Sequence, residues 1–218
     1  ILLASLRSVA GVFMVLSLII LSLIGMMGSM GWIRGLTGSD RFVFSIMNTS
    51  MPIILMTIAN SDSVHFLTKF FKKLRITGDK TTAIEQSIDS LMLPIFLTSL
   101  TTAAAFLSLV FAPIEYMTGY GVSIAIGISW AWILSTTLLP SLIMLKDWPL
   151  NSRAIRKPGL LERIVDKFGS KLIKLPRSIL IGGLILVAVG LYGIKLVTTE
   201  VNMFSFFKKG NKIRASLE

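Results

Sequence analysis

An aspartate and a histidine three residues apart, Asp62 and His65, lie within a long apolar stretch of the sequence. Ionisable groups are costly at membrane depth, so they are rare there and usually face the interior of a helix bundle or a wet cavity. A spacing of three places both side chains on one face of a helix. This pair indicates a chain that moves something across a membrane, and protons are the first candidate.

The position of Asp62 favours a proton-binding role over that of a group that simply reaches water. Asp62 precedes Lys69 by about 10 Å along a helix, and an aspartate side chain is too short to reach the surface as a lysine does. Desolvation disfavours a charged carboxylate, so we expect Asp62 to bind and release a proton near neutral pH. His65 would share that proton, or would instead be an interfacial hydrogen-bonding residue.

A second polar cluster at 98–102 is followed by three alanines that end at Ala105. Small residues let membrane helices approach closely, and hydroxyl groups hydrogen-bond across such contacts. We expect a packing seam here, with Thr101 and Thr102 as the residues that would extend a proton path. The same packing role is expected of four glycines: Gly25, Gly28, Gly121 and Gly127.

Composition excludes several classes of protein. Hydrophobic residues make up 53% of the chain and charged residues only 15%, which is too apolar for a soluble domain. There is no cysteine and only one histidine, so no thiolate site, no disulfide and no histidine-based zinc site is expected. No phosphate-binding glycine loop is present. Composition alone leaves a Ser–His–Asp hydrolase open, but the sequence has no nucleophile-elbow motif. We therefore predict no enzyme activity, no metal and no cofactor.

The positive charge follows membrane topology. A net charge of +11 would suggest nucleic acid in a soluble protein, but here the Lys and Arg residues alternate with apolar runs. This is the positive-inside pattern, so we expect no nucleic acid and a multi-pass protein of the cytoplasmic (inner) membrane. Arg7 and the basic stretches 69–80 and 146–177 are expected on the cytoplasmic side, with 160–175 along the interface.

Apolar runs and breakers give the expected boundaries of the helices. We predict a helix at 9–32, a polar loop at 34–41, and a span kinked by Pro52. A polar connector is expected at 69–86, with Pro94 opening the next span. The expected parts are a transmembrane block at 1–145, a basic cytoplasmic linker at 146–177, a further span at 178–197 and the start of an extracytoplasmic domain at 198–218. The sequence has no initiator methionine or signal peptide and is interpreted as a fragment.

Several strings resemble one family of transporters. Ala59-Asn60-Ser61-Asp62-Ser63-Val64-His65 resembles the fourth transmembrane helix of resistance–nodulation–division (RND) exporters, closest to the MMPL-type and hydrophobe-exporter branch. The strings at 97–109 and 119–142 are similar to the fifth and sixth helices, and 201–214 to the opening of the second extracytoplasmic domain. The same block of helices is shared with sterol-sensing domains.

The resemblance implies an all-α integral membrane fold, with helices two to seven of a twelve-helix bundle. It implies export of lipids or hydrophobic and amphiphilic compounds driven by protons, and the acidic proton site of helix four carries over to Asp62 alone. Two departures are Ser63, where many relatives have an aromatic residue, and Ala105, where they have glycine. The implied partners are the lipid bilayer, a lipid or hydrophobic substrate, protons and the second half of the same polypeptide, with a homo-oligomer left open.

Two other functions stay open at this point. One is a sterol-sensing-type module that binds lipid and regulates without pumping. The other, ranked lower, is a Sec-type accessory that uses protons to pull secreted proteins. The exporter and both alternatives need a membrane helix bundle. Only the exporter and the Sec-type accessory need the proton site.

Overall fold

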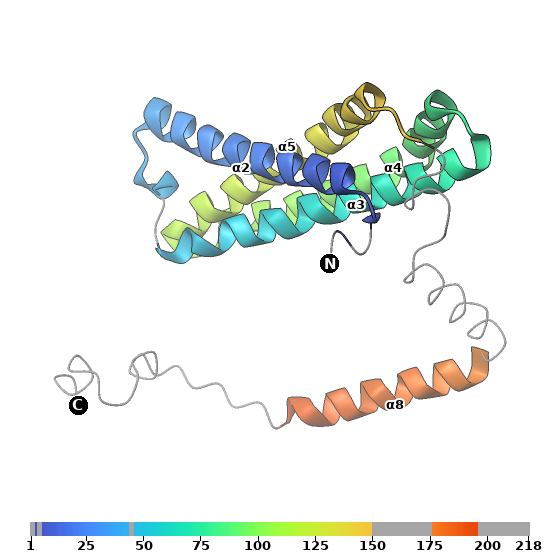
Figure 1. Cartoon of the computed structure of the whole chain (residues 1–218). Coiled ribbons are helices and arrows are strands. Elements are labelled where there is room, and N and C mark those ends of the chain that lie inside the picture. The colour runs from blue at the N-terminus through green and yellow to red at the C-terminus, as the bar shows by residue number, and fades with distance from the viewer. Residues whose placement is uncertain (1–2, 4–5, 44–45, 150–175, 196–218) are drawn as a thin grey trace, which may run out of the picture. The chain divides into compact units, whose positions relative to one another are not determined.

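The computed structural model describes residues 3, 6–43, 46–149 and 176–195, which form helices and no strand. The first of two compact units contains four long helices (Figure 1), which are α2 (Val9–Thr37), α3 (Met51–Thr77), α4 (Lys80–Leu107) and α5 (Glu115–Leu145). Short 3-10 turns join them at Asp40–Phe42, Ile46–Ser50 and Ser108–Phe111. The second unit contains α8 (Pro176–Ile194). The predicted all-α class is confirmed.

The Asp62 helix, α3, lies at the centre of the bundle. α3 and α5 each contact all three other helices of the unit, whereas α2 and α4 lie mainly against this central pair. The face of α3 that enters the core carries Leu55, Ala59, Phe66 and Phe70, whose spacing follows the helical period. Asp62 belongs to the same buried face, so the fold places a carboxyl group beside an apolar core.

Four helical stretches are long and apolar enough to cross a membrane: Val9–Thr37, Lys80–Phe111, Tyr116–Leu145 and Arg177–Ile194. α3 is not one of them, because Asn60, Asp62 and His65 interrupt its apolar sequence. It nevertheless has 27 residues, more than the roughly 20 that a span requires. Polar groups inside a span are tolerated where neighbouring helices cover them, and α3 has such neighbours on three sides.

The predicted polar connector at 69–86 is wrong. α3 continues to Thr77 and α4 begins at Lys80, so only Gly78 and Asp79 join them. Gly78 adopts a left-handed φ of 69°, which glycine permits without strain. Asp79 caps α4 by accepting a hydrogen bond from the Thr82 backbone N–H at 2.8 Å. Lys and Arg are good helix formers, so the charged residues of this stretch extend the two helices.

The two prolines have other positions than predicted. Pro52 lies in the first turn of α3, where its missing N–H leaves no hydrogen bond unmade, so it starts the helix and does not kink it. Pro94 lies near the middle of α4 and does not open it. A proline there removes the hydrogen bond that the Ser90 carbonyl would otherwise accept.

Helix ends elsewhere also differ from the predicted boundaries. α2 runs five residues past the predicted end at Trp32 and includes Arg34, which the sequence assigned to a loop. Glu115, expected in a tight loop, is the first residue of α5. A helix covers Pro176–Ile194, where a span at 178–197 is predicted. The predicted interfacial stretch at 160–175 and the domain start at 198–218 lie outside the described residues.

Three of the four glycines assigned to packing lie at close helix contacts. A Cβ atom at Gly25 would lie 2.8 Å from Cγ of Trp130, and one at Gly127 would lie 3.0 Å from side-chain atoms of Leu55 and Met26. At Gly121 it would meet the backbone carbonyl of Phe106. Two packing assignments have no such support among the described residues: a Cβ atom at Gly28 would have no neighbouring heavy atom within 4 Å, and Ala105 is exposed.

Candidate functional site

A cavity of about 530 Å³ lies along the seam between α3 and α4. It is open on one side, and both helices contribute polar and apolar side chains. From α3 it is lined by Thr57, Ile58, Ser61, Asp62 and His65, and from α4 by Leu91, Pro94, Ile95, Thr98, Ser99 and Thr102. The α4 residues recur every three or four positions, so they form one stripe on that helix.

Asp62 is the buried ionisable group of this cavity. Its relative exposure is 9%, and its Oδ2 atom has no hydrogen-bond partner among the described residues. The neighbouring hydroxyl of Ser63 does not serve it, because Ser63 Oγ donates to the Ala59 carbonyl at 2.8 Å. A buried polar atom is expected to be hydrogen-bonded, and an exception in such a place calls for a functional explanation.

Ser99 lies on the opposite wall of the same cavity; the sequence predicted a packing role for it within the cluster at 98–102 and did not include it in the proton path. Its exposure is 6%, and its Oγ atom also has no hydrogen-bond partner in the described part of the chain. Ser99 is close enough to Asp62 to influence its carboxyl group, but no hydrogen bond of standard geometry joins them. The sequence signal that could have identified Ser99 is its spacing of four from Ile95. This spacing places both residues on one face of α4, and that face is buried. Two unpartnered oxygens, from Asp62 and Ser99, thus line one cavity from two helices.

The other residues of the predicted proton path are placed differently. His65 lines the cavity but is exposed, and no hydrogen bond or ion pair joins it to Asp62 in the described structure. Thr102 also lines the cavity, with its hydroxyl donating to the Thr98 carbonyl at 2.6 Å. Thr101 is exposed, does not line the cavity and donates to the Leu97 carbonyl at 2.8 Å.

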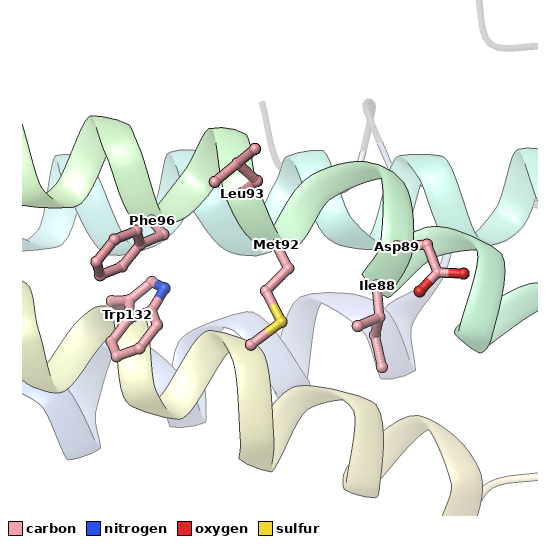
Figure 2. A pocket seen from close by; sticks show the side chains of 6 residues that line it. All are labelled: Ile88, Asp89, Met92, Leu93, Phe96 and Trp132. Atoms are coloured by element: carbon pink, nitrogen blue, oxygen red, sulfur yellow. The ribbon is translucent and has the colours of Figure 1, made fainter.

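A second cavity, of about 500 Å³, lies between α4 and α5 on another face of α4. Its walls are apolar except at one end (Figure 2): they are formed by Ile88, Asp89, Met92, Leu93, Phe96 and Trp132. The Asp89 carboxylate lies at that end, and the Phe96 and Trp132 rings lie at the other, with their centroids 5.2 Å apart. The size and lining suit an apolar chain.

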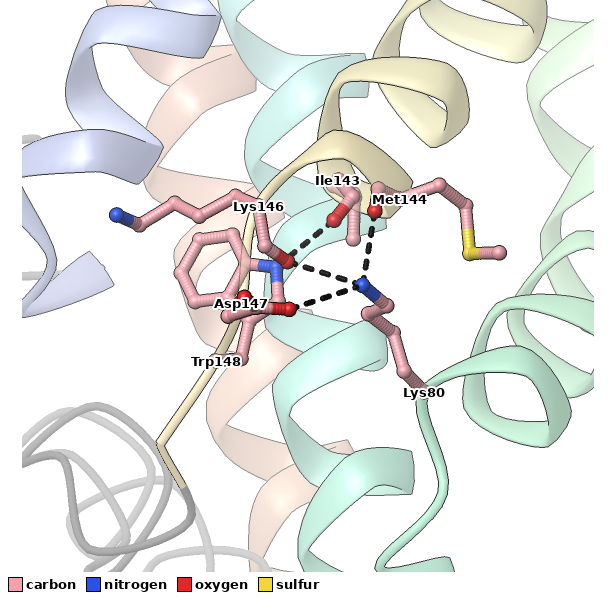
Figure 3. A network of polar contacts seen from close by, with 6 residues as sticks. All are labelled: Lys80, Ile143, Met144, Lys146, Asp147 and Trp148. Carbon is pink, nitrogen blue, oxygen red and sulfur yellow. Dashed lines mark hydrogen bonds and ion pairs between the residues drawn. The ribbon is translucent and has the colours of Figure 1, made fainter.

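The start of α4 is fixed to the end of α5 by Lys80 (Figure 3). Its Nζ atom donates to the Met144 carbonyl at 2.8 Å and to the Lys146 carbonyl at 3.2 Å, and lies 3.7 Å from an Asp147 carboxylate oxygen. A cation is favourable at a helix C-terminus, where carbonyl groups lack intrahelical donors. This contact holds the α3–α4 turn against α5.

Trp148 strengthens the same junction. Its Nε1 atom donates to the Ile143 carbonyl at 3.0 Å. Its ring lies edge-on to Phe70 and Phe71 of α3, with centroid distances of 5.9 and 5.2 Å. Aromatic pairs in this arrangement stabilise beyond the area they bury. The C-terminal part of α3, the start of α4 and the end of α5 are therefore joined at one corner of the bundle, and the cavity at Asp62 lies further along α3 and α4.

Four helices that are long and apolar enough to cross a membrane indicate a multi-pass membrane protein. The chain belongs to the MMPL family, whose sequence model matches residues 1–163. A relative from Methanocaldococcus jannaschii, whose name describes it only as a membrane protein, is 25% identical over 116 residues. That match covers 53% of this chain and 30% of the relative. No solved structure matches the chain.

Proposed function

We propose that this chain is the membrane-embedded part of an exporter of lipids or hydrophobic and amphiphilic compounds, driven by the proton-motive force, with Asp62 as the proton-binding group. The observation that carries the proposal is the burial of the Asp62 carboxyl group, without a partner, beside an open polar cavity in a membrane helix bundle. Membership of the MMPL family supports the transporter class.

The energetics favour an exchangeable proton at Asp62. An isolated carboxylate among apolar groups is costly, and binding a proton removes its charge. The cavity gives this group access to water from one side. Each elementary charge that crosses the membrane field releases about 2.3 kcal/mol per 100 mV. That is enough to shift an equilibrium between two arrangements of α3 and α4 about fiftyfold, since about 1.4 kcal/mol corresponds to a factor of ten.

The proposed setting follows from charge and burial. The basic stretches next to the α3–α4 turn and after α5 favour the cytoplasmic face of the cytoplasmic membrane for these ends. The open side of the Asp62 cavity is the face on which a second helical half of the same polypeptide would supply further groups. The apolar outer surfaces of α4 and α8 contact the lipid bilayer, from which a hydrophobic substrate would enter.

The test is efflux of the hydrophobic dye Nile red from energised cells that express the intact protein carrying this chain. Asp62→Asn preserves the size of the side chain and removes the titratable group, so we expect efflux to fall to the level of cells without the protein. Asp40→Asn is the matched control, because Asp40 lies in an exposed turn and pairs only loosely with Arg34 at 3.8 Å.

Membrane insertion and abundance are expected to be equal in both variants, as measured by immunoblots of membrane fractions. Undiminished dye efflux by Asp62→Asn would reject the proposal. Equal loss in Asp40→Asn would also reject it, because the effect would then not depend on the buried site.

The apolar cavity between α4 and α5 favours one second candidate, a lipid-binding regulatory module. In that case a photoactivatable lipid would label the wall formed by Phe96 and Trp132, and labelling would be unchanged by Asp62→Asn. The two candidates separate on efflux, because a module that only senses lipid drives no dye out of energised cells.

A further inference from the structure

We propose that the cavity at Asp62 also binds a monovalent metal cation, with sodium as the fitting ion, and that this cation competes with the proton for the Asp62 carboxylate. The inference rests on the proposed function, because it names a second coupling ion for the same site. It is carried by the hydrogen-bonding state of the oxygen atoms that line the cavity.

Two of these oxygens are buried and make no hydrogen bond of standard geometry. Asp62 Oδ2 and Ser99 Oγ lie on adjacent helices and line the same cavity, and Ser99 is close enough to Asp62 to influence its carboxyl group. Both residues are more than nine-tenths buried. A buried carboxylate oxygen without a hydrogen bond costs free energy, so Asp62 Oδ2 favours a ligand that supplies positive charge. The Ser99 hydroxyl has two lone pairs besides its hydrogen, so Ser99 Oγ can contact the same cation.

The threonines that line the cavity offer further acceptors and no donors. Thr57 Oγ1 donates to the Ile53 carbonyl at 2.8 Å, Thr98 Oγ1 to the Ile95 carbonyl at 2.9 Å and Thr102 Oγ1 to the Thr98 carbonyl at 2.6 Å. A hydroxyl group has one hydrogen and two lone pairs. Because each hydrogen is already used within its own helix, these oxygens present only lone pairs to a ligand.

The Asp62 carboxylate and the lone pairs of these threonines favour a cation over an anion. Carboxylate and hydroxyl oxygens are the ligands that hard metal ions prefer. The site has one carboxyl group, and the described residues contain no group of three His, Cys, Asp or Glu side chains that could hold a metal. One carboxylate neutralises one positive charge, so a divalent ion would leave an unbalanced buried charge.

Two further features bear on the ion. The only other titratable group that lines the cavity in the described structure is His65, which is exposed. The volume of about 530 Å³ exceeds the roughly 30 Å³ that one water occupies in the liquid, so the ion would keep part of its hydration shell. A hydronium ion also presents positive charge to oxygen lone pairs, and the experiment must therefore separate sodium from the proton.

The experiment is proton release from the purified intact protein in detergent, followed by a pH-indicator dye in weakly buffered solution. We expect sodium chloride to release protons, choline chloride to release none, and Asp62→Asn to abolish the sodium response. Ser99→Ala is expected to raise the sodium concentration for half-maximal release about tenfold, as for the loss of one polar contact. Ser108→Ala, on an exposed hydroxyl outside the cavity, is expected to match the wild type.

Protonation of Asp62 is measured separately, from the infrared carboxyl band that Asp62→Asn removes. If this band titrates but sodium releases no protons, the sodium inference is overturned and the proposed function stands. If sodium-dependent release persists in Asp62→Asn, the inference is also overturned, because the ion then binds elsewhere. If no band titrates and sodium has no effect, the proton site fails and the inference fails with it.

Discussion

Asp62 differs from the other acidic residues of the described chain in its surroundings. The other acidic side chains that the structure describes are exposed: Asp40, Asp79, Glu85, Asp89 and Asp147. Asp62 alone among these six lies against the core, with Ser99 facing the same cavity from α4. Protonation of an exposed carboxyl group has little effect on the helices around it. Protonation of a buried one removes a charge from the interior and so changes the stability of the surrounding helix packing.

Asp79 is an exposed carboxyl group whose charged form is stabilised by hydrogen bonds. Hydrogen bonds from the Thr82 backbone N–H and hydroxyl group hold the pKa of Asp79 below its ordinary value. A lowered folded-state pKa means that this cap contributes its full stabilisation above the ordinary pKa of aspartate. The contribution is lost as the pH falls through the lowered value.

We therefore predict that Asp79→Ala lowers the thermal midpoint of the purified protein at pH 7, and that the difference from wild type shrinks as the pH falls below that of ordinary aspartate titration. Asp79→Asn is the control, because asparagine also caps helices but does not titrate. The difference in thermal midpoint between Asp79→Asn and wild type is also expected to shrink as the pH falls. A pH-independent difference between Asp79→Ala and wild type would contradict the role of the charged Asp79 carboxylate as a helix cap.

At the scale of elements, the close approach of α5 to the end of α4 depends on Gly121. A Cβ atom there would meet the backbone carbonyl of Phe106, which cannot move aside as a side chain can. Gly28 on α2 has the same residue type and open space around it. A side chain at Gly121 would therefore clash with a neighbouring helix, whereas one at Gly28 would not.

Gly121→Ala is expected to destabilise the bundle by about 1–3 kcal/mol, the usual cost of overpacking. Gly28→Ala is expected to be neutral or to stabilise by up to about 1 kcal/mol, because alanine has the higher helix propensity. Thermal unfolding of the two variants in the same detergent measures the difference. Equal midpoints would show that the contact between α4 and α5 is looser than the structure indicates.

At the scale of the whole molecule, the basic stretches predict which ends of the helices face the cytoplasm. The α3–α4 turn is joined to the end of α5 through Lys80, so these ends belong to one face of the bundle. The end of α2 at Thr37 belongs to the other face, because α2 and α3 are consecutive and contact each other along the bundle. The positive-inside pattern predicts that the first face lies on the cytoplasmic side.

This orientation is tested by single cysteines, since the chain contains none of its own. In an intact protein without other reactive cysteines, Thr37→Cys is expected to react with a membrane-impermeant maleimide added to whole cells. Thr81→Cys, exposed beside the α3–α4 turn, is expected to react only after the cells are opened. The reverse pattern would place the basic stretches outside the cell and contradict the proposed orientation of the helix ends.

Local sequence determined the class of the protein and its most informative residue. Long apolar runs require membrane helices, because backbone polar groups in lipid must be satisfied within each segment. A lone carboxyl group in such a run is conspicuous whatever the tertiary structure, so Asp62 could be singled out directly. Helix ends were predicted less well, because charged residues and prolines occur both in connectors and inside helices, as the positions of Lys80 and Pro94 show.

The groups that accompany Asp62 are set by the packing of the helices against one another. Ser99 and Thr101 are two residues apart in similar sequence, yet Ser99 lines the cavity and Thr101 does not. The difference is the rotation of α4 about its axis, since each residue turns the helix by about 100°. That rotation is set by the packing of α4 against α3 and α5, and it is a property of several helices together that no single segment encodes.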